Sequence, residues 1–347
     1  MNWKCKFFAK AAVAALALLN AAPMLHGQAN PPSAPTASTA SAPAPKANLP
    51  LFPPPNMKNF TSDAVSVATV NAFLTQLWGY DPNRVWQVAA IQKTPAPGII
   101  KIVVFVAEKG AAESKTSGTQ FFVTPDGKHA IADAVIDFGA TPFAATRKTL
   151  QASADGAARG AAGNELLLVE FSDLQCPHCK EAQSTMDKLA KDFPAARIVY
   201  QSFPLVDVHP AAFKAAAYGY CVEKQSNPAF FKYAQAVFDT QEALTPANTD
   251  QTLANAVTSA GLNPAEVATC AATPEIKAKV DASIKLAEDL GVSATPTLFV
   301  NGRSLPMSNI QYEMLKAIIS FQAVQDGVST GASATPAPST ATPAPAK

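Results

Sequence analysis

Residues 166–183 read LLLVEFSDLQCPHCKEAQ, an apolar run followed by two cysteines and a polar stretch. The run 166–171, interrupted only by Glu170, predicts a strand, and the polar residues predict a helix from about Cys176 to Phe193. Cys176 and Cys179 therefore lie where a strand passes into a helix. Whether this pair belongs to a zinc site, a structural disulfide or a redox centre depends on the rest of the chain.

The residues after this stretch continue to alternate between strand and helix patterns. We expect a strand at 197–203, a helical block at about 209–290, and then a strand at 297–300 with a turn and a final helix. That order predicts an α/β domain over residues 165–327, in which the helical block at about 209–290 is an insertion into the sheet.

The pattern of residues 56–150 differs from the pattern after them. Val70, Phe73 and Leu74 lie on one face of a predicted helix. Strand-like runs follow at 86–91, 99–107, 119–124 and 129–137. One helix and then strands predict a small α+β domain with a cystatin-like fold. The Ala- and Gly-rich residues 151–164 predict a linker between the two domains.

The N-terminus has the pattern of an export signal. Lys4, Lys6 and Lys10 precede an apolar run from Ala11 that is shorter than the ~20 residues of a membrane-spanning helix. We therefore predict a signal peptide over residues 1–29 and a location in the periplasm, with a retained membrane anchor as the alternative. Removal of the peptide, with Cys5 in it, leaves an even number of cysteines, which favours disulfides in an oxidising compartment.

Both ends of the mature chain are rich in Pro, Ala, Ser and Thr. Residues 30–55 and 328–347 have too few apolar side chains to fold, so we predict a disordered linker and a disordered tail. The net charge is +1 and only 15% of residues are charged. This balance excludes a strongly basic surface, and we expect no nucleic-acid partner.

Two interpretations of the cysteine pair are weak. A zinc site needs four ligands, but the chain has no second CxxC, and His209 is the only nearby histidine outside the motif. A structural disulfide across two residues would close a very small loop, and stabilisation grows with loop length. We therefore expect neither a metal nor a cofactor.

The redox interpretation uses each feature of the motif. At a helix N-terminus, free backbone N–H groups and the helix dipole favour an anionic sulfur at Cys176. His178, between the cysteines, adds a donor or a positive charge, and Cys179 would be the resolving thiol. A stabilised thiolate favours the reduced state and makes the disulfide a stronger oxidant.

Cys-Pro-His-Cys after a strand, with Glu170 six residues before the first cysteine, resembles the DsbA-type thiol-disulfide oxidoreductases. A second motif of that family, GVSATPTLFVNG, stands at 291–302. The resemblance implies a thioredoxin fold and a cis Thr295–Pro296 bond, with both residues presenting backbone to substrate. It also implies that Glu170 is a buried proton acceptor, although a strand-edge glutamate facing water is the alternative. A DsbB-like redox partner in the membrane would reoxidise the enzyme.

Cys221 and Cys270 lie in the predicted helical block. If they are bonded, the loop between them is worth roughly 4 kcal/mol in the chain-entropy model, so we expect a structural disulfide. A second, electron-relaying pair is the alternative, which the spacing of these cysteines disfavours.

The stretch FFVTPDGKHAIADAVIDFG and the RKTLQA after it resemble the N-terminal dimerisation domain of DsbC-type disulfide isomerases. That resemblance implies a homodimer with an isomerase or reductase activity. The active-site dipeptide Pro177-His178, however, is of the oxidase type. We therefore predict an exported oxidase acting on unfolded or reduced exported proteins. A dimeric isomerase or reductase is the first alternative, and a non-enzymatic chaperone or docking module is the second.

Overall fold

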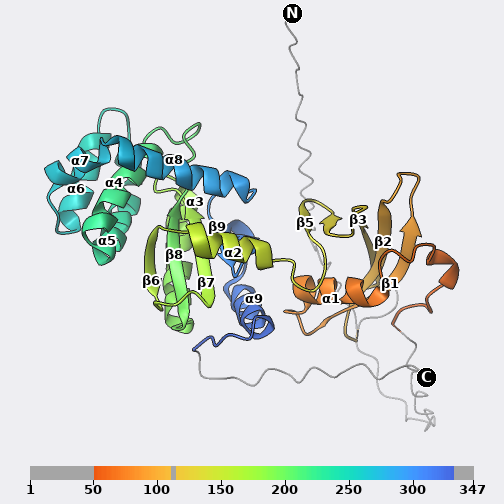
Figure 1. Ribbon diagram of the computed structural model, residues 1–347. Helices are drawn as coiled ribbons and strands as arrows, with labels where there is room; N and C mark the ends of the chain where they lie inside the picture. Colours follow the sequence, from red (N-terminus) through yellow and green to blue (C-terminus); the bar gives the residue numbers. More distant parts are fainter. Residues whose placement is uncertain (1–50, 111–114, 332–347) are drawn as a thin grey trace, which may run out of the picture. The chain divides into compact units, whose positions relative to one another are not determined.

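The computed structural model describes residues 51–110 and 115–331 (Figure 1). The predicted signal peptide, most of the N-terminal linker and most of the C-terminal tail lie outside these residues. The described residues form two separate five-stranded sheets. In these residues no helix combines the length and the apolar character needed to cross a membrane.

The first sheet is antiparallel throughout, in the order β1-β2-β3-β4-β5. Its strands are β1 (Arg84–Lys93), β2 (Ile100–Glu108), β3 (Ser117–Val123), β4 (His129–Ile131) and β5 (Val135–Asp137). Helix α1 (Val67–Trp78) buries Val70, Phe73 and Leu74 in the same hydrophobic cluster as β1, β2 and β3. This is the expected α+β arrangement, except that the predicted strand 129–137 is two short strands.

The second sheet has the order β10-β9-β7-β8-β6. Its strands are β6 (Ala157–Gly160), β7 (Leu166–Ser172), β8 (Ala196–Ser202), β9 (Thr297–Val300) and β10 (Arg303–Pro306). The central strand β7 is buried over its whole length, parallel to β8 and antiparallel to β9. With helices on both faces, this mixed sheet has the thioredoxin fold.

The residues of β7 alternate between the two faces of the sheet. Leu166 and Leu168 pack with α3 (Pro177–Asp192) and α9 (Tyr312–Gln325). Leu167, Val169 and Phe171 pack on the other face, in a cluster that includes Leu150 and Leu286. By this alternation, Glu170 lies on the face that α3 covers.

The prediction of a linker over 151–164 is wrong. Leu150 of α2 (Ala144–Ser153) packs with β7, and β6 pairs with β8 as an edge strand. The sequence of β6, AARG, consists mostly of small residues and lacks the apolar alternation that predicts a strand. Gly160 illustrates why: its φ is +87°, and a Cβ there would lie 2.1 Å from the carbonyl oxygen of Ala196. The second predicted domain therefore begins before residue 165.

Helices α4 to α8 form the insertion between β8 and β9, close to its predicted bounds (Figure 1). They are α4 (Ala212–Gln225), α5 (Asn227–Asp239), α6 (Thr249–Ser259), α7 (Pro264–Ala271) and α8 (Pro274–Asp289). The core of the insertion also contains Cys176 and Cys179, so the inserted helices pack against the predicted redox site. Cys221 and Cys270 form a disulfide between α4 and α7.

Candidate active site

Cys176 is the N-cap of α3, and Pro177 is the first helical residue. The backbone N–H groups of Cys179 and Lys180 donate to the carbonyl of Cys176, which closes the first turn of the helix. Both cysteines are free thiols in this structure. Cys176 is 5% exposed and Cys179 is completely buried, so Cys176 is the sulfur that a second molecule can reach.

The environment of Cys176 favours its thiolate. A hydrogen bond from the Cys179 side chain is the largest cause that lowers the pKa of Cys176 from 9.0 to about 5. Burial opposes this change, while the Thr295 side chain and the backbone N–H groups of Cys179 and His178 support it. The backbone donors at the start of α3 therefore act on this sulfur as the sequence predicts.

The pKa of Cys179 moves in the opposite direction. Burial is the largest cause that raises it well above its ordinary value, and the neighbouring Cys176 sulfur raises it further. The backbone N–H of Asp173 donates to the Cys179 sulfur at 3.3 Å and partly opposes these effects. The two thiols thus have different states at neutral pH: Cys176 is an anion and Cys179 is a protonated donor to it.

A cis peptide bond joins Thr295 and Pro296, as the resemblance implies. The Cys176 sulfur lies 3.7 Å from the Thr295 carbonyl oxygen, so this bond and the dithiol meet at one point. The Thr295 hydroxyl is buried and has no hydrogen-bond partner among the described residues. It can therefore donate a hydrogen bond to the Cys176 thiolate, whose pKa it helps to lower. A hollow beside Pro296 is lined by His178, Glu181, Ala182, Thr185, Met307, Ser308 and Ile310.

Glu170 is buried, so the alternative of a water-facing strand glutamate is wrong. Burial is the largest cause that raises the pKa of its carboxyl from 4.5 to about 7, and the side chains of Ser172 and Gln183 oppose this change. The amide of Gln183 donates to Glu170 Oε1 at 3.1 Å and to the carbonyl of Cys179 at 3.0 Å. Gln183 therefore joins the Glu170 carboxyl to the helical turn that contains Cys179.

The side chain of His178 is exposed and does not bond to either sulfur. Its Nδ1 lies 3.1 Å from Glu181 Oε2, and this hydrogen bond is the largest cause that raises the pKa of the imidazole. The thiolate of Cys176 raises that pKa as well. His178 therefore acts on Cys176 at a distance, through its charge, and at close range through its backbone N–H.

Sequence reasoning missed the polar residues that hold the loop before Cys176. These are Asp173, which bonds to His209; Gln175, which bonds to Ala211 and Leu244; and Gln241, which bonds to Leu174 and Cys176. Gln183 was missed too, although its position four residues after Cys179 places it on the same helical face. His209, considered as a zinc ligand, bonds to Asp173 instead. No three His, Cys, Asp or Glu side chains in the described residues gather in a way that could hold a metal ion.

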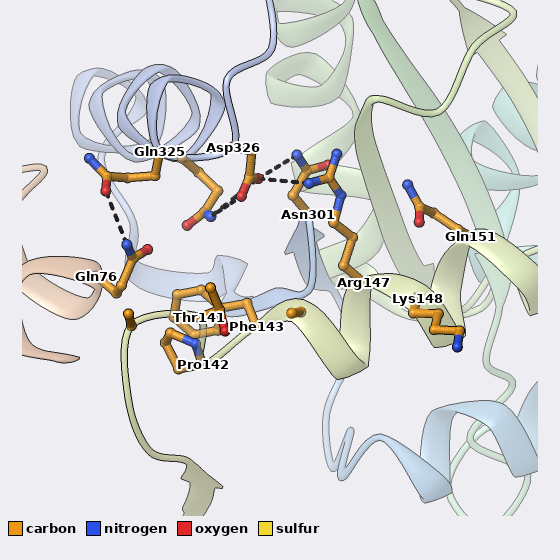
Figure 2. Close-up of a pocket in the computed structure, with 13 residues that line it drawn as sticks. Gln76, Thr141, Pro142, Phe143, Arg147, Lys148, Gln151, Asn301, Gln325 and Asp326 are labelled. Atoms are coloured by element: carbon orange, nitrogen blue, oxygen red, sulfur yellow. Dashed lines mark hydrogen bonds and ion pairs between the residues drawn. The ribbon is translucent and has the colours of Figure 1, made fainter. Parts of the chain in front are cut away.

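A separate pocket lies near α2 and the end of α9 (Figure 2). Its main charges pair with each other: Arg147 lies 3.5 Å from Asp326, which also accepts a hydrogen bond from Asn301 at 2.7 Å. The pocket is lined by no cysteine or histidine, so we assign it no part in thiol chemistry.

Comparison with known protein families gives a match over part of the chain. Residues 153–320 match the family model described as Thioredoxin. Among curated proteins, the Na(+)/H(+) antiporter NhaA 3 of Salinispora tropica is 31% identical over 145 residues, which cover 42% of this chain and 21% of the antiporter. The NhaA 1 antiporter of Mycolicibacterium vanbaalenii is 30% identical over 145 residues, with 42% and 23% covered. The chain thus spans about a fifth of the length of these relatives.

Similar solved structures include a thioredoxin-like oxidoreductase from Silicibacter pomeroyi, with 22% identity and a TM-score of 0.44 over 51% of this chain and 98% of that one. The catalytic domain of Proteus mirabilis ScsC has 22% identity and a TM-score of 0.43, with 52% and 98% covered. Oxidised BdbD from Bacillus subtilis has 20% identity and a TM-score of 0.44, with 50% and 93% covered.

Proposed function

We propose, from the match of residues 153–320 to the Thioredoxin family model, that this protein is a thiol-disulfide oxidoreductase whose redox pair is Cys176 and Cys179. The observation that carries the proposal is the opposite change in the two thiol pKa values beside the cis Thr295–Pro296 bond. This geometry makes Cys176 the reactive sulfur and keeps Cys179 buried away from other molecules.

The oxidation of a substrate dithiol proceeds in two exchanges. A substrate thiolate attacks Cys176 of the Cys176–Cys179 disulfide, and Cys179 leaves as a thiolate that takes a proton from Glu170. The second substrate thiolate then attacks the substrate sulfur of the mixed disulfide, and Cys176 leaves as the stabilised thiolate. The substrate loses two electrons to the enzyme disulfide, and Thr295 and Pro296 present their backbone to the substrate during both steps.

The direction of exchange follows from the stability of the reduced form. A thiolate with a pKa of about 5 is a good leaving group, and its stability favours reduced enzyme over reduced substrate. This supports a disulfide oxidase rather than an isomerase or reductase, in agreement with the Pro177-His178 dipeptide. The substrates are reduced or unfolded exported proteins in the periplasm. A DsbB-like membrane protein accepts the electrons from the reduced enzyme.

The decisive experiment mixes the oxidised protein with a reduced two-cysteine peptide and follows peptide oxidation by mass spectrometry. We expect one peptide disulfide for each enzyme molecule, and none with Cys176→Ser. Mixed instead with the oxidised peptide, a Cys179→Ser variant should trap a mixed disulfide: the Cys176 thiolate attacks the peptide disulfide, one peptide sulfur leaves as a thiolate, and no Cys179 thiol is present to release the other. Peptide oxidation that persists in Cys176→Ser would disprove the proposal, whereas no oxidation by the unaltered protein would favour the alternative of a docking module with structural cysteines.

The first sheet supports a second candidate, a dimeric isomerase or reductase. Its single helix on an antiparallel sheet has the α+β arrangement expected from the resemblance to the DsbC-type dimerisation domain. Light scattering of the mature protein tests for the homodimer, and refolding of a scrambled substrate tests for isomerisation. A monomer that oxidises but does not reshuffle disulfides would leave the oxidase as the function.

A further inference from the structure

A largely buried hydrogen bond between Asp173 and His209 links the loop before the cysteines to the segment between β8 and α4. The Asp173 carboxylate has no exposed surface, and its Oδ2 lies 2.7 Å from Nδ1 of His209. Because an ionised carboxylate only accepts hydrogen bonds, Nδ1 carries the hydrogen. Oδ2 also accepts the N–H of Leu205 at 2.9 Å, and Oδ1 accepts the N–H of Gln175 at 2.7 Å. The carboxylate therefore has partners in both chain segments.

The backbone of the same residue contacts both cysteines. The N–H of Asp173 donates to the Cys179 sulfur at 3.3 Å, and its carbonyl accepts the N–H of Cys176 at 3.0 Å. A displacement of the Asp173 carboxylate would therefore move the peptide groups that hold the two sulfurs. The orientation of the Asp173 side chain and the geometry of the dithiol therefore depend on each other.

His209 is the partner of Asp173 that the reaction described above does not use. Within the described part of the chain, it is the one basic side chain within hydrogen-bond distance of the Asp173 carboxylate. Its own backbone is fixed by a turn, in which its N–H donates to Leu205 and its carbonyl accepts from Ala212. A buried carboxylate is costly unless it is paired, so the loss of His209 should let Asp173 turn away from its present position.

We infer that His209 is a positioning residue for the dithiol: its hydrogen bond to Asp173 fixes the Asp173 N–H against the Cys179 sulfur. This inference rests on the proposed function. Donation to the Cys179 sulfur polarises its S–H group, and the polarised S–H is a better donor to the Cys176 thiolate. Through this chain of bonds, His209 stabilises the reduced enzyme without touching either cysteine.

The test compares three variants of the full chain with the unaltered protein. His209→Ala removes the donor, and His209→Asn places an amide nitrogen at the position of Nδ1. His129→Ala is the matched control, because His129 on β4 also lies between carboxylates, 3.4 Å from Asp126 and 3.8 Å from Asp137. The readouts are the equilibrium with glutathione and the ultraviolet absorbance of the Cys176 thiolate during a pH titration.

We expect His209→Ala to weaken the oxidising power about tenfold, or about 30 mV, and to shift the thiolate titration to higher pH. His209→Asn should restore both readouts to within about twofold, and His129→Ala should change neither. The inference is wrong if His209→Ala behaves as the unaltered protein does, or if His209→Asn is as impaired as His209→Ala. It is also wrong if His129→Ala gives the same shift.

Two outcomes need a separate readout: a variant that does not fold, and an unaltered protein that does not oxidise dithiols. If His209→Ala does not fold, His209→Gln replaces it, because its amide nitrogen corresponds to Nε2 rather than Nδ1. If the unaltered protein oxidises no dithiol, the proposed function fails by itself. The thiolate titrations of the variants still show whether His209 acts on the cysteines.

Discussion

The side-chain amide of Gln183 donates to the Glu170 carboxylate at 3.1 Å, inside the face of the sheet that α3 covers. The same nitrogen donates to the carbonyl of Cys179 at 3.0 Å. Glu170 is buried, and Gln183 both orients its carboxylate and joins it to the turn of Cys179. Burial raises the pKa of Glu170 to about 7, which suits a group that exchanges protons with a thiol near neutral pH.

Burial of Glu170 should make the stability of the reduced protein depend on pH. The unfolded state releases the Glu170 proton near 4.5, whereas the folded state keeps it until about 7. Between these values the folded state binds more protons, so the free energy of unfolding falls as pH rises. The difference between 4.5 and about 7 corresponds to about 3 kcal/mol, all of it lost above pH 7.

Glu170→Gln removes this dependence and keeps the shape of the side chain. We expect the variant and the unaltered protein to have similar stability near pH 4. The variant should be more stable by up to about 3 kcal/mol at pH 8. Urea unfolding of the two reduced proteins at both pH values measures this difference in stability. The cysteines titrate in both proteins, so their contribution cancels in the comparison. Equal stability at pH 8 would show that Glu170 ionises without cost.

Gln183→Met should raise the pKa of Glu170 further, because the substitution removes a donor to the carboxylate and keeps the volume of the side chain. The lost bond to the Cys179 carbonyl lowers stability equally at all pH values. The lost bond to Glu170 lowers it only where the carboxylate is ionised in the unaltered protein. Unfolding measurements should therefore show a loss that is constant below pH 6 and larger at pH 9. A loss independent of pH would mean that Gln183 does not act on Glu170.

Cys179→Ala should raise the pKa of Cys176 toward its ordinary value of 9.0, because the Cys179 thiol is the largest cause of the low value. We expect a rise of more than about one pH unit in the rate profile of iodoacetamide alkylation. Cys179→Ser keeps a donor at the same position and serves as the control, with a smaller rise. If both variants alkylate with the profile of the unaltered protein, the helix terminus alone stabilises the thiolate.

The sequence predicted the parts of the site that lie in continuous motifs. Cys176 and Cys179 share one short motif, and the position of Glu170 in a buried strand follows from the apolar residues around it. The cis bond at Pro296 followed from a family resemblance, since the residues alone do not specify it. Helix and strand order was predictable wherever the apolar pattern was strong, as in the helical spacing of α1 and the continuous apolar run of β7.

The remaining features depend on contacts between distant residues. Asp173 and His209 are 36 positions apart, and neither has a neighbour in sequence that indicates the pairing. The edge strand β6 was predicted as linker because its Ala and Gly residues have no apolar alternation, while its pairing with β8 needs only backbone groups. Polar partners and edge strands are properties of the assembled sheet, and a single sequence does not display them.

Replacement of both Cys221 and Cys270 by Ala should weaken the helical insertion and leave the exchange chemistry intact. The disulfide closes a loop with a separation of 49 residues, for which the chain-entropy model gives a stabilisation of about 4 kcal/mol. Cys221 is buried in the core of the insertion, so its truncation adds a smaller packing loss. Thermal unfolding of the oxidised proteins measures the effect. Peptide oxidation below the melting transition should remain within about twofold, because the proposed function places exchange at Cys176 and Cys179. A complete loss of oxidation in the folded double variant would show instead that the second pair relays electrons.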